Sequence, residues 1–155
     1  MESEYEADFA LVSGFHKTAL EKLGSIELEL LPPAGRVIVM IWTADGIIGN
    51  GGLRYFFESD FHDGTPFTDF ITAYAAIGAV DCANALRTAL TLFPGGYPQH
   101  DLEERNELLD KLDDDKGPLG LLDTVFFQSS EENVGLLAAY LRVHQPEIDA
   151  FLKDP

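Results

Sequence analysis

The sequence predicts an all-α protein, a single-domain orthogonal bundle of about seven or eight helices over residues 1–155. Apolar residues recur at helical spacing through most of the chain. Glycine and proline clusters separate these stretches, and several stretches follow a residue type that commonly begins a helix. With 46% apolar residues, a chain of this length can bury one sizeable core.

The first third of the chain contains the least certain elements. Residues 3–23 have a helical pattern interrupted at Gly14, which predicts one broken helix or two short ones. Residues 24–35 hold several glycines and prolines and read as a connection, although alternation at 26–30 allows a brief extended segment. The β-branched run from Arg36 to Trp42 favours a strand by propensity, but periodicity alone cannot distinguish so short a run from a buried helix.

The chain is organised around residues 49–61, where Asn50-Gly51-Gly52 leads directly into an aromatic cluster. Consecutive glycines after Asn permit a positive φ angle or a close backbone approach. Leu53, Phe56 and Phe57 then follow the i, i+3, i+4 spacing of one helix face. We predict a sharp joint between helices that directs these aromatic residues into the core. A phosphate-binding glycine loop is the alternative, but neither of its usual motifs is present.

Two helices are predicted next. Thr65 is the predicted N-cap and Pro66 the first residue of a helix that ends near Gly78. Asp81 is predicted to cap the following helix, which stops at Pro94. The predicted buried positions of this second helix are Ala85, Leu86, Ala89, Leu90 and Phe93.

The last third is predicted to hold four helices. Asp101 and Glu104 form a capping box for a helix to about Asp115, with an inward edge formed by Leu102, Leu108, Leu109 and Leu112. Gly117-Pro118 ends it. A short apolar helix over 119–127, a helix capped by Ser129 and Glu132, and a terminal helix from Pro146 to about Leu152 complete the bundle.

The charge is strongly acidic, because 27 Asp and Glu oppose 10 Lys and Arg for a formal net charge of −17. Such a surface repels nucleic-acid phosphates and attracts basic protein patches. We therefore expect no direct nucleic-acid binding and no membrane association, and the single cysteine favours a cytoplasmic location. The single cysteine, Cys82, is consistent with a reducing compartment and is predicted to be buried.

Motifs for catalysis or metal binding are missing from the sequence. The four histidines do not have the spacing of a zinc site, and the consecutive acids 113–115 do not alternate as in a calcium loop. We expect no metal and no cofactor. The alternative from a different functional class is a small hydrolase or metal-dependent enzyme that uses a cleft near His62, Asp63 and the Gly51-Gly52 joint.

The clearest candidate site is the acidic helix after residue 100. Glu103, Glu107, Asp110 and Asp114 follow i, i+4, i+7, i+11, so these carboxylates share one stripe about 5 to 6 Å apart. That spacing is of the same order as the spacing of charges on a nucleic-acid strand, and the stripe could imitate phosphates. A merely solvated face is the alternative explanation. The full candidate set is Glu103, Glu104, Glu107, Asp110, Asp113, Asp114 and Asp115.

Two motifs together resemble a bacterial domain-of-unknown-function family that includes DNA mimic protein 19. The first is Asn50-Gly51-Gly52 with Phe56-Phe57, and the second is the Ala-Ile-Gly-Ala segment around Gly78. The likeness covers about residues 35–115. The chain departs from the family pattern at four positions: Ile47, Leu53, Tyr55 and Ser59.

The resemblance implies an all-α fold, and it favours a helix over residues 36–48 against their β propensity. It also implies a non-enzymatic protein that occupies the DNA-binding surface of a transcription factor. We expect a basic DNA-binding protein or nuclease as partner, and a monomer or homodimer. An immunity or antitoxin protein that blocks a basic toxin is a second possibility in the same class.

Overall fold

The computed structural model describes residues 3–59, 65–112 and 117–154, and it confirms the all-α prediction. These residues form seven α-helices and two short 3₁₀ helices. In chain order they are α1 (Glu4–Leu23), η1 (Leu28–Leu30), α2 (Pro33–Glu58), α3 (Phe67–Ala76), α4 (Val80–Leu90), η2 (Pro94–Gly96), α5 (Leu102–Leu112), α6 (Pro118–Val143) and α7 (Gln145–Lys153).

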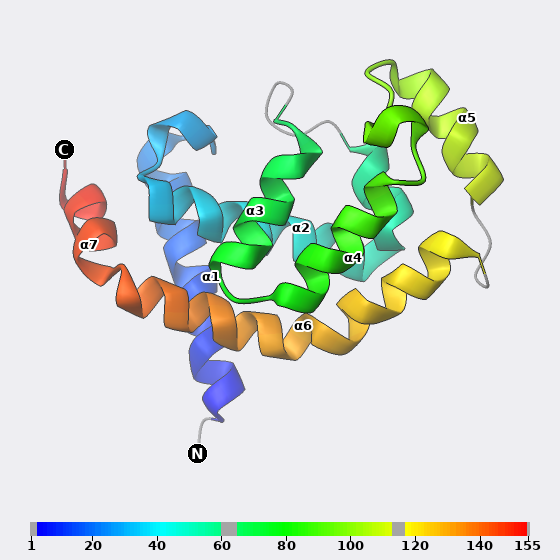
Figure 1. The fold of residues 1–155 in the computed structure, drawn as a ribbon. Helices are drawn as coiled ribbons and strands as arrows, with labels where there is room; N and C mark the ends of the chain where they lie inside the picture. Colours follow the sequence, from blue (N-terminus) through cyan, green and yellow to red (C-terminus); the bar gives the residue numbers. More distant parts are fainter. Residues whose placement is uncertain (1–2, 60–64, 113–116, 155) are drawn as a thin grey trace.

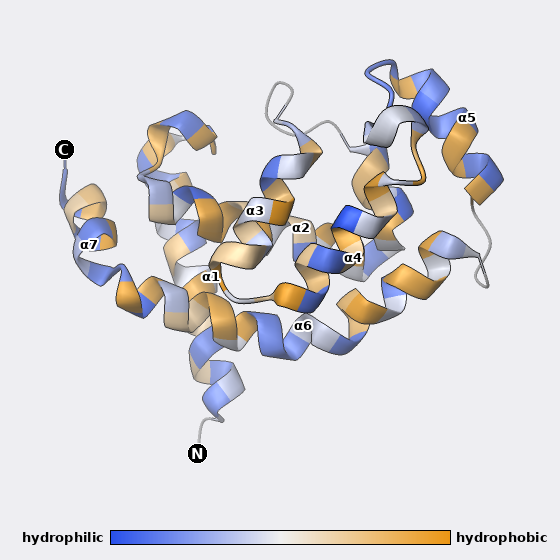
Figure 2. Cartoon of the chain, viewed as in Figure 1, coloured by the Kyte–Doolittle hydropathy of each residue, from blue (hydrophilic) through white to orange (hydrophobic). Residues whose placement is uncertain are grey.

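The long helices α2 and α6 form the centre of the bundle. α6 packs against α1, α2 and α4, while α3 packs on α4 and α5 lies against α2 (Figure 1). Hydrophilic and hydrophobic residues alternate along α4, α5 and α6, as expected for helices with one buried face (Figure 2). The core includes the predicted positions of α4 and Cys82, which are all buried.

α1 is a single continuous helix, so the predicted interruption at Gly14 is wrong. Gly14 lies within the helix, with no neighbouring atom where a Cβ would be. Ser3 and Glu6 form a reciprocal capping box at its start, and Gly24 ends it with a φ of 75°. One helical glycine costs only about 1 kcal/mol, which the packing of α1 on α6 offsets.

Residues 36–42 are helical, as the family resemblance implied and against their β propensity. Ile38, Val39 and Ile41 are fully buried within α2, because that part of the helix lies in the middle of the bundle. A strand there would have lacked a partner for its backbone groups. Tertiary burial therefore overrides local preference, and residues 28–30 form a 3₁₀ turn instead of an extended segment.

The joint predicted at Asn50-Gly51-Gly52 is confirmed, and the structure places it at Gly52. This residue has non-helical dihedral angles, φ 72° and ψ −173°, and divides α2 into a long first part and a short second part. Leu53, Phe56 and Phe57 are fully buried after the bend. Phe56 stacks edge-on against Phe70 with ring centroids 5.1 Å apart, so the bend places the aromatic cluster against α3.

Three helix boundaries differ from the prediction. α3 begins at Phe67, with Pro66 in the N-cap position, and α4 has Ala79 at its N-cap while Asp81 lies in its first turn. The largest difference is α6, because residues 119–127 and the segment after Ser129 form one helix. The predicted capping box at Ser129 lies in the middle of α6, and apolar residues packed on the core occur both before and after it, so no new helix begins there. The end of the α5 segment, 113–116, lies outside the described residues.

Candidate functional site

The acidic helix α5 has a side-chain cap at its start and one fully buried leucine. Asp101 accepts a hydrogen bond from the Glu104 backbone N–H at 3.0 Å, which is one half of the predicted capping box. Leu109 is fully buried. Leu102 is 38% exposed, so the predicted inward edge is narrower than the leucine spacing suggested.

Arg105 also attaches α5 to the rest of the protein, and this role was not anticipated from the sequence. Its side chain is only 4% exposed and donates to the backbone carbonyl of Phe57 at 3.0 Å and to that of Gln99 at 2.9 Å. The Phe57 carbonyl belongs to the last turn of α2, where unpaired carbonyls favour a cation. This charge therefore holds α5 against the end of α2.

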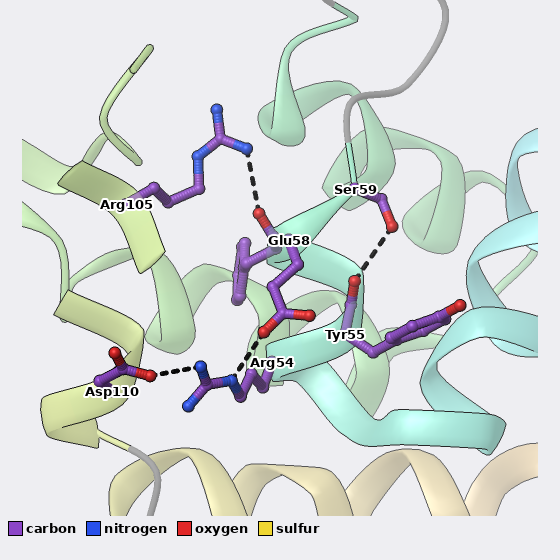
Figure 3. Close-up of polar contacts among 7 residues, drawn as sticks. Arg54, Tyr55, Glu58, Ser59, Arg105 and Asp110 are labelled. Carbon is purple, nitrogen blue, oxygen red and sulfur yellow. Dashed lines mark hydrogen bonds and ion pairs between the residues drawn. The ribbon is translucent and has the colours of Figure 1, made fainter. Parts of the chain in front are cut away.

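The acidic residues of α5 divide into two kinds. Glu103, Glu104 and Glu107 are exposed, and none of them takes part in an ion pair within the described part of the chain. Asp110 is also exposed but pairs with the Arg54 guanidinium at 2.5 Å. Figure 3 shows Arg54 between Asp110 and Glu58, to which it also bonds at 2.7 Å.

Three of the predicted acidic residues are therefore exposed and have no ion-pair partner among the described residues. We call the exposed carboxylates of Glu103, Glu104 and Glu107 the α5 acidic face. Asp113, Asp114 and Asp115, like His62 and Asp63, lie outside the described residues. The charge of Asp110 is partly compensated by Arg54, so this side chain contributes less to the field of the stripe.

The Gly52 joint depends on a carboxylate from a distant helix. Asp123, in α6, accepts a hydrogen bond from the Leu53 backbone N–H at 2.7 Å. It thereby caps the second part of α2 as an N-cap side chain would. A Cβ atom at Gly52 would lie 2.6 Å from Asp123 Oδ2, so the glycine is required for this approach. Asn50 and Gly51 are exposed and helical, and the joint is a packing feature.

A second polar group is buried among helices α2, α3, α4 and α6. Tyr74 donates to Asp45 Oδ1 at 2.5 Å, and Asn133 donates to Asp45 Oδ2 at 3.0 Å and contacts Cys82 Sγ at 3.5 Å. Burial raises the pKa of the Asp45 carboxyl, while both hydrogen bonds oppose this shift. Burial also raises the pKa of the Cys82 thiol, which makes it a poor nucleophile.

Asp45 could have been noticed from the sequence, since it is the one charged residue between Arg36 and Arg54. Its partners are 29 and 88 positions away, so no local pattern connects them. The same holds for Asp123 and Leu53, which are 70 positions apart. In both cases the acid is visible in the sequence and its function is not.

The described part of the chain holds neither a cluster of metal-ligating side chains nor a helix that could span a membrane. Across residues 3–59, 65–112 and 117–154, no three His, Cys, Asp or Glu side chains gather where they could hold a metal ion. Within the same ranges, none of the helices has the length and apolar character needed to span a bilayer. The α5 acidic face is the described part of the predicted site, and its carboxylates are exposed.

Comparison with known families agrees with the two-motif resemblance. A family model described as DMP19-like protein matches residues 29–144, a longer span than the motifs alone covered. Neither the curated proteins nor the solved structures gave a significant match to the chain. The family model covers most of the sequence, including the Gly52 joint, Asp123 and the α5 acidic face, and the chain therefore belongs to the DMP19-like protein family.

Proposed function

We propose that this protein is a non-enzymatic, acidic interaction module that occupies the nucleic-acid-binding surface of a basic protein. The observation that carries the proposal is the α5 acidic face, three exposed carboxylates without a cationic partner among the described residues. Membership of the DMP19-like family supports the same role. A DNA-binding protein such as a transcription factor is the partner that fits best.

The spacing of these carboxylates supports a resemblance to phosphates. Residues four apart on a helix are separated by about 6 Å along the axis, which is larger than the axial phosphate spacing of about 3.4 Å on one strand but of the same order. Long, flexible Lys and Arg side chains in a groove that binds a nucleic-acid backbone can span this difference and reach both Glu103 and Glu107. The net charge of −17 adds a long-range attraction that accelerates association.

The test is a pull-down from lysate of the source cell at low and high salt, followed by binding measurements on the recovered protein. We expect a basic DNA-binding protein or nuclease that elutes as salt rises, because exposed charges are screened within about 8 Å at physiological ionic strength. DNA should compete with this protein for the partner. A partner that binds DNA and this protein simultaneously would contradict mimicry.

Charge reversal locates the surface. The variant Glu103→Lys/Glu107→Lys should lose most of the affinity for the partner. The matched control is Glu21→Lys/Glu29→Lys, which changes the net charge equally at two exposed positions on α1 and η1, well away from α5 (Figure 1). Equal losses in both variants would mean that only the overall charge matters, and the α5 acidic face would not be the site.

A further inference from the structure

A second surface feature lies between α1, α2 and α6, the three helices that contribute its lining residues. It is a cavity of about 280 Å³ lined by Tyr5, Phe9, Trp42, Asp45, Val134 and Leu137 among others. We call it the aromatic–Asp45 pocket. Its volume is below the usual range for drug-sized ligands and suits one inserted side chain.

The aromatic wall of this pocket is partly open to solvent. Phe9 packs on Trp42 with ring centroids 5.1 Å apart, and Tyr5 lies 6.1 Å from Phe9. Tyr5 is 40% exposed and Phe9 is 43% exposed, although both are large aromatic residues. Three neighbouring rings therefore present π surface that the chain does not cover, and such faces attract cations.

The polar wall is the carboxylate of Asp45. Tyr74 and Asn133 each donate one hydrogen bond to it, which fixes its orientation and leaves acceptor positions open, since a carboxylate has about four. None of the ion pairs formed by the described residues includes Asp45. Burial without a compensating cation raises the pKa of this carboxyl, and a cation placed beside it would lower that pKa.

We propose that the aromatic–Asp45 pocket receives the guanidinium group of an arginine side chain from a basic protein partner. Open aromatic faces next to a partly buried, uncompensated carboxylate form a complement to that group. A guanidinium stacks on aromatic rings, bonds a carboxylate through two parallel N–H groups, and is more weakly hydrated than an ammonium. The assignment of this arginine to a protein partner rests on the function proposed above. The preference of the pocket for a guanidinium group is independent of that function.

The pocket contains its own spectroscopic probe, because Trp42 is the only tryptophan in the chain. Titration with N-acetylarginine amide should produce a saturable change in Trp42 fluorescence. Nα-acetylcitrulline amide has nearly the same shape without the charge. Nα-acetyllysine amide has a positive charge but lacks the planar guanidinium group. We expect the arginine compound to bind at least ~10-fold more tightly than the citrulline compound and ~3-fold more tightly than the lysine compound.

Two variants and two controls test the residues. Asp45→Asn should weaken arginine binding at least ~10-fold, and Phe9→Leu should weaken it ~3-fold. Glu103→Gln removes a charge on α5, and Tyr97→Leu removes an aromatic ring that is 71% exposed elsewhere; neither should change binding. If Asp45→Asn does not fold, Phe9→Leu with its Tyr97→Leu control still decides the matter.

The proposal is overturned by a linear, unsaturable response, by equal binding of arginine and citrulline compounds, or by tighter binding of lysine. These results are independent of the α5 acidic face. A saturable, Asp45-dependent change in Trp42 fluorescence, together with unchanged partner affinity in Glu103→Lys/Glu107→Lys, would support the pocket and reject mimicry through α5. The reverse combination would retain α5 and reject the pocket.

Discussion

Gly52 offers the sharpest test of the fold, because its conformation and its surroundings both exclude a side chain. Its φ of 72° with ψ of −173° lies in a region that is essentially restricted to glycine and costs other residues about 1 to 3 kcal/mol. In Gly52→Ala the new Cβ would lie 2.6 Å from Asp123 Oδ2. The carboxylate must move, which weakens its 2.7 Å hydrogen bond to the Leu53 N–H and costs a further ~1 to 2 kcal/mol.

We therefore expect Gly52→Ala to lower the free energy of unfolding by about 2 to 5 kcal/mol, a large part of the stability of a typical domain. The measurement is urea unfolding followed by far-UV circular dichroism. Gly49→Ala is the control, since Gly49 is exposed and helical, with no atom within 4 Å of the added Cβ. It should be neutral or stabilise the protein by up to ~1 kcal/mol.

A double-mutant cycle separates strain from the lost cap. Asp123→Ala alone should lower the free energy of unfolding by about 1 to 2 kcal/mol. The double variant Gly52→Ala/Asp123→Ala should lose at least ~0.5 kcal/mol less than the two single variants lose in sum, because the clash between the new Cβ and the carboxylate is then absent. If the free energy of unfolding of Gly52→Ala lies within ~0.5 kcal/mol of the wild-type value, then neither the dihedral angles nor the nearby Asp123 carboxylate require a glycine at this position.

Four further results are expected. The raised pKa of Asp45 means that the folded protein binds the proton of this carboxyl more tightly than the unfolded chain does. The free energy of unfolding of the wild type, relative to that of Asp45→Asn, should therefore fall as pH rises from about 3.8 through the folded pKa and then stay constant. Urea unfolding at a series of pH values measures this difference. Cys82 should react with a thiol reagent at least ~10-fold more slowly in the native protein than in urea, because burial disfavours its thiolate. Arg105→Leu should lower the free energy of unfolding by about 3 kcal/mol, because buried carbonyls lose a charged donor. Asp110→Asn should change it by less than ~1 kcal/mol, because the ion pair with Arg54 is exposed.

Each of these results has an opposite that would count against its premise. Relative stability that rises with pH would mean that Asp45 is stabilised as a carboxylate. Fast labelling of native Cys82 would place that thiol at the surface. A neutral Arg105→Leu would mean that α5 is held mainly by Leu109, and a large loss in Asp110→Asn would mean that its ion pair is shielded from water.

Local sequence chemistry was sufficient for much of the fold. The stretch Asn50-Gly51-Gly52 followed by apolar residues at helical spacing predicted the bend and the burial of Phe56 and Phe57, because backbone freedom and side-chain periodicity are local properties. Asp101 was identified as a cap for the same reason. The exposed acids of α5 followed from spacing on one helix face.

Other features were decided by contacts between distant segments. Residues 36–42 are helical because they lie at the centre of the bundle, and residues 118–143 form one helix because its face is buried along most of its length. Helix propensities and capping patterns are local, so they do not report whether a segment lies at the centre of the bundle or is buried along its length.

The sequence by itself determined the fold class, the sign of the charge and the place where the chain bends, because composition, periodicity and glycine positions are written in it directly. Only the tertiary structure decided which acids are free. Asp110 pairs with Arg54, Asp123 caps Leu53, Asp45 stands without a cation beside three aromatic rings, and Glu103 and Glu107 remain exposed. The physical reason is that a carboxylate's role depends on the groups within a few ångströms of it, and those groups come from residues far away in the chain.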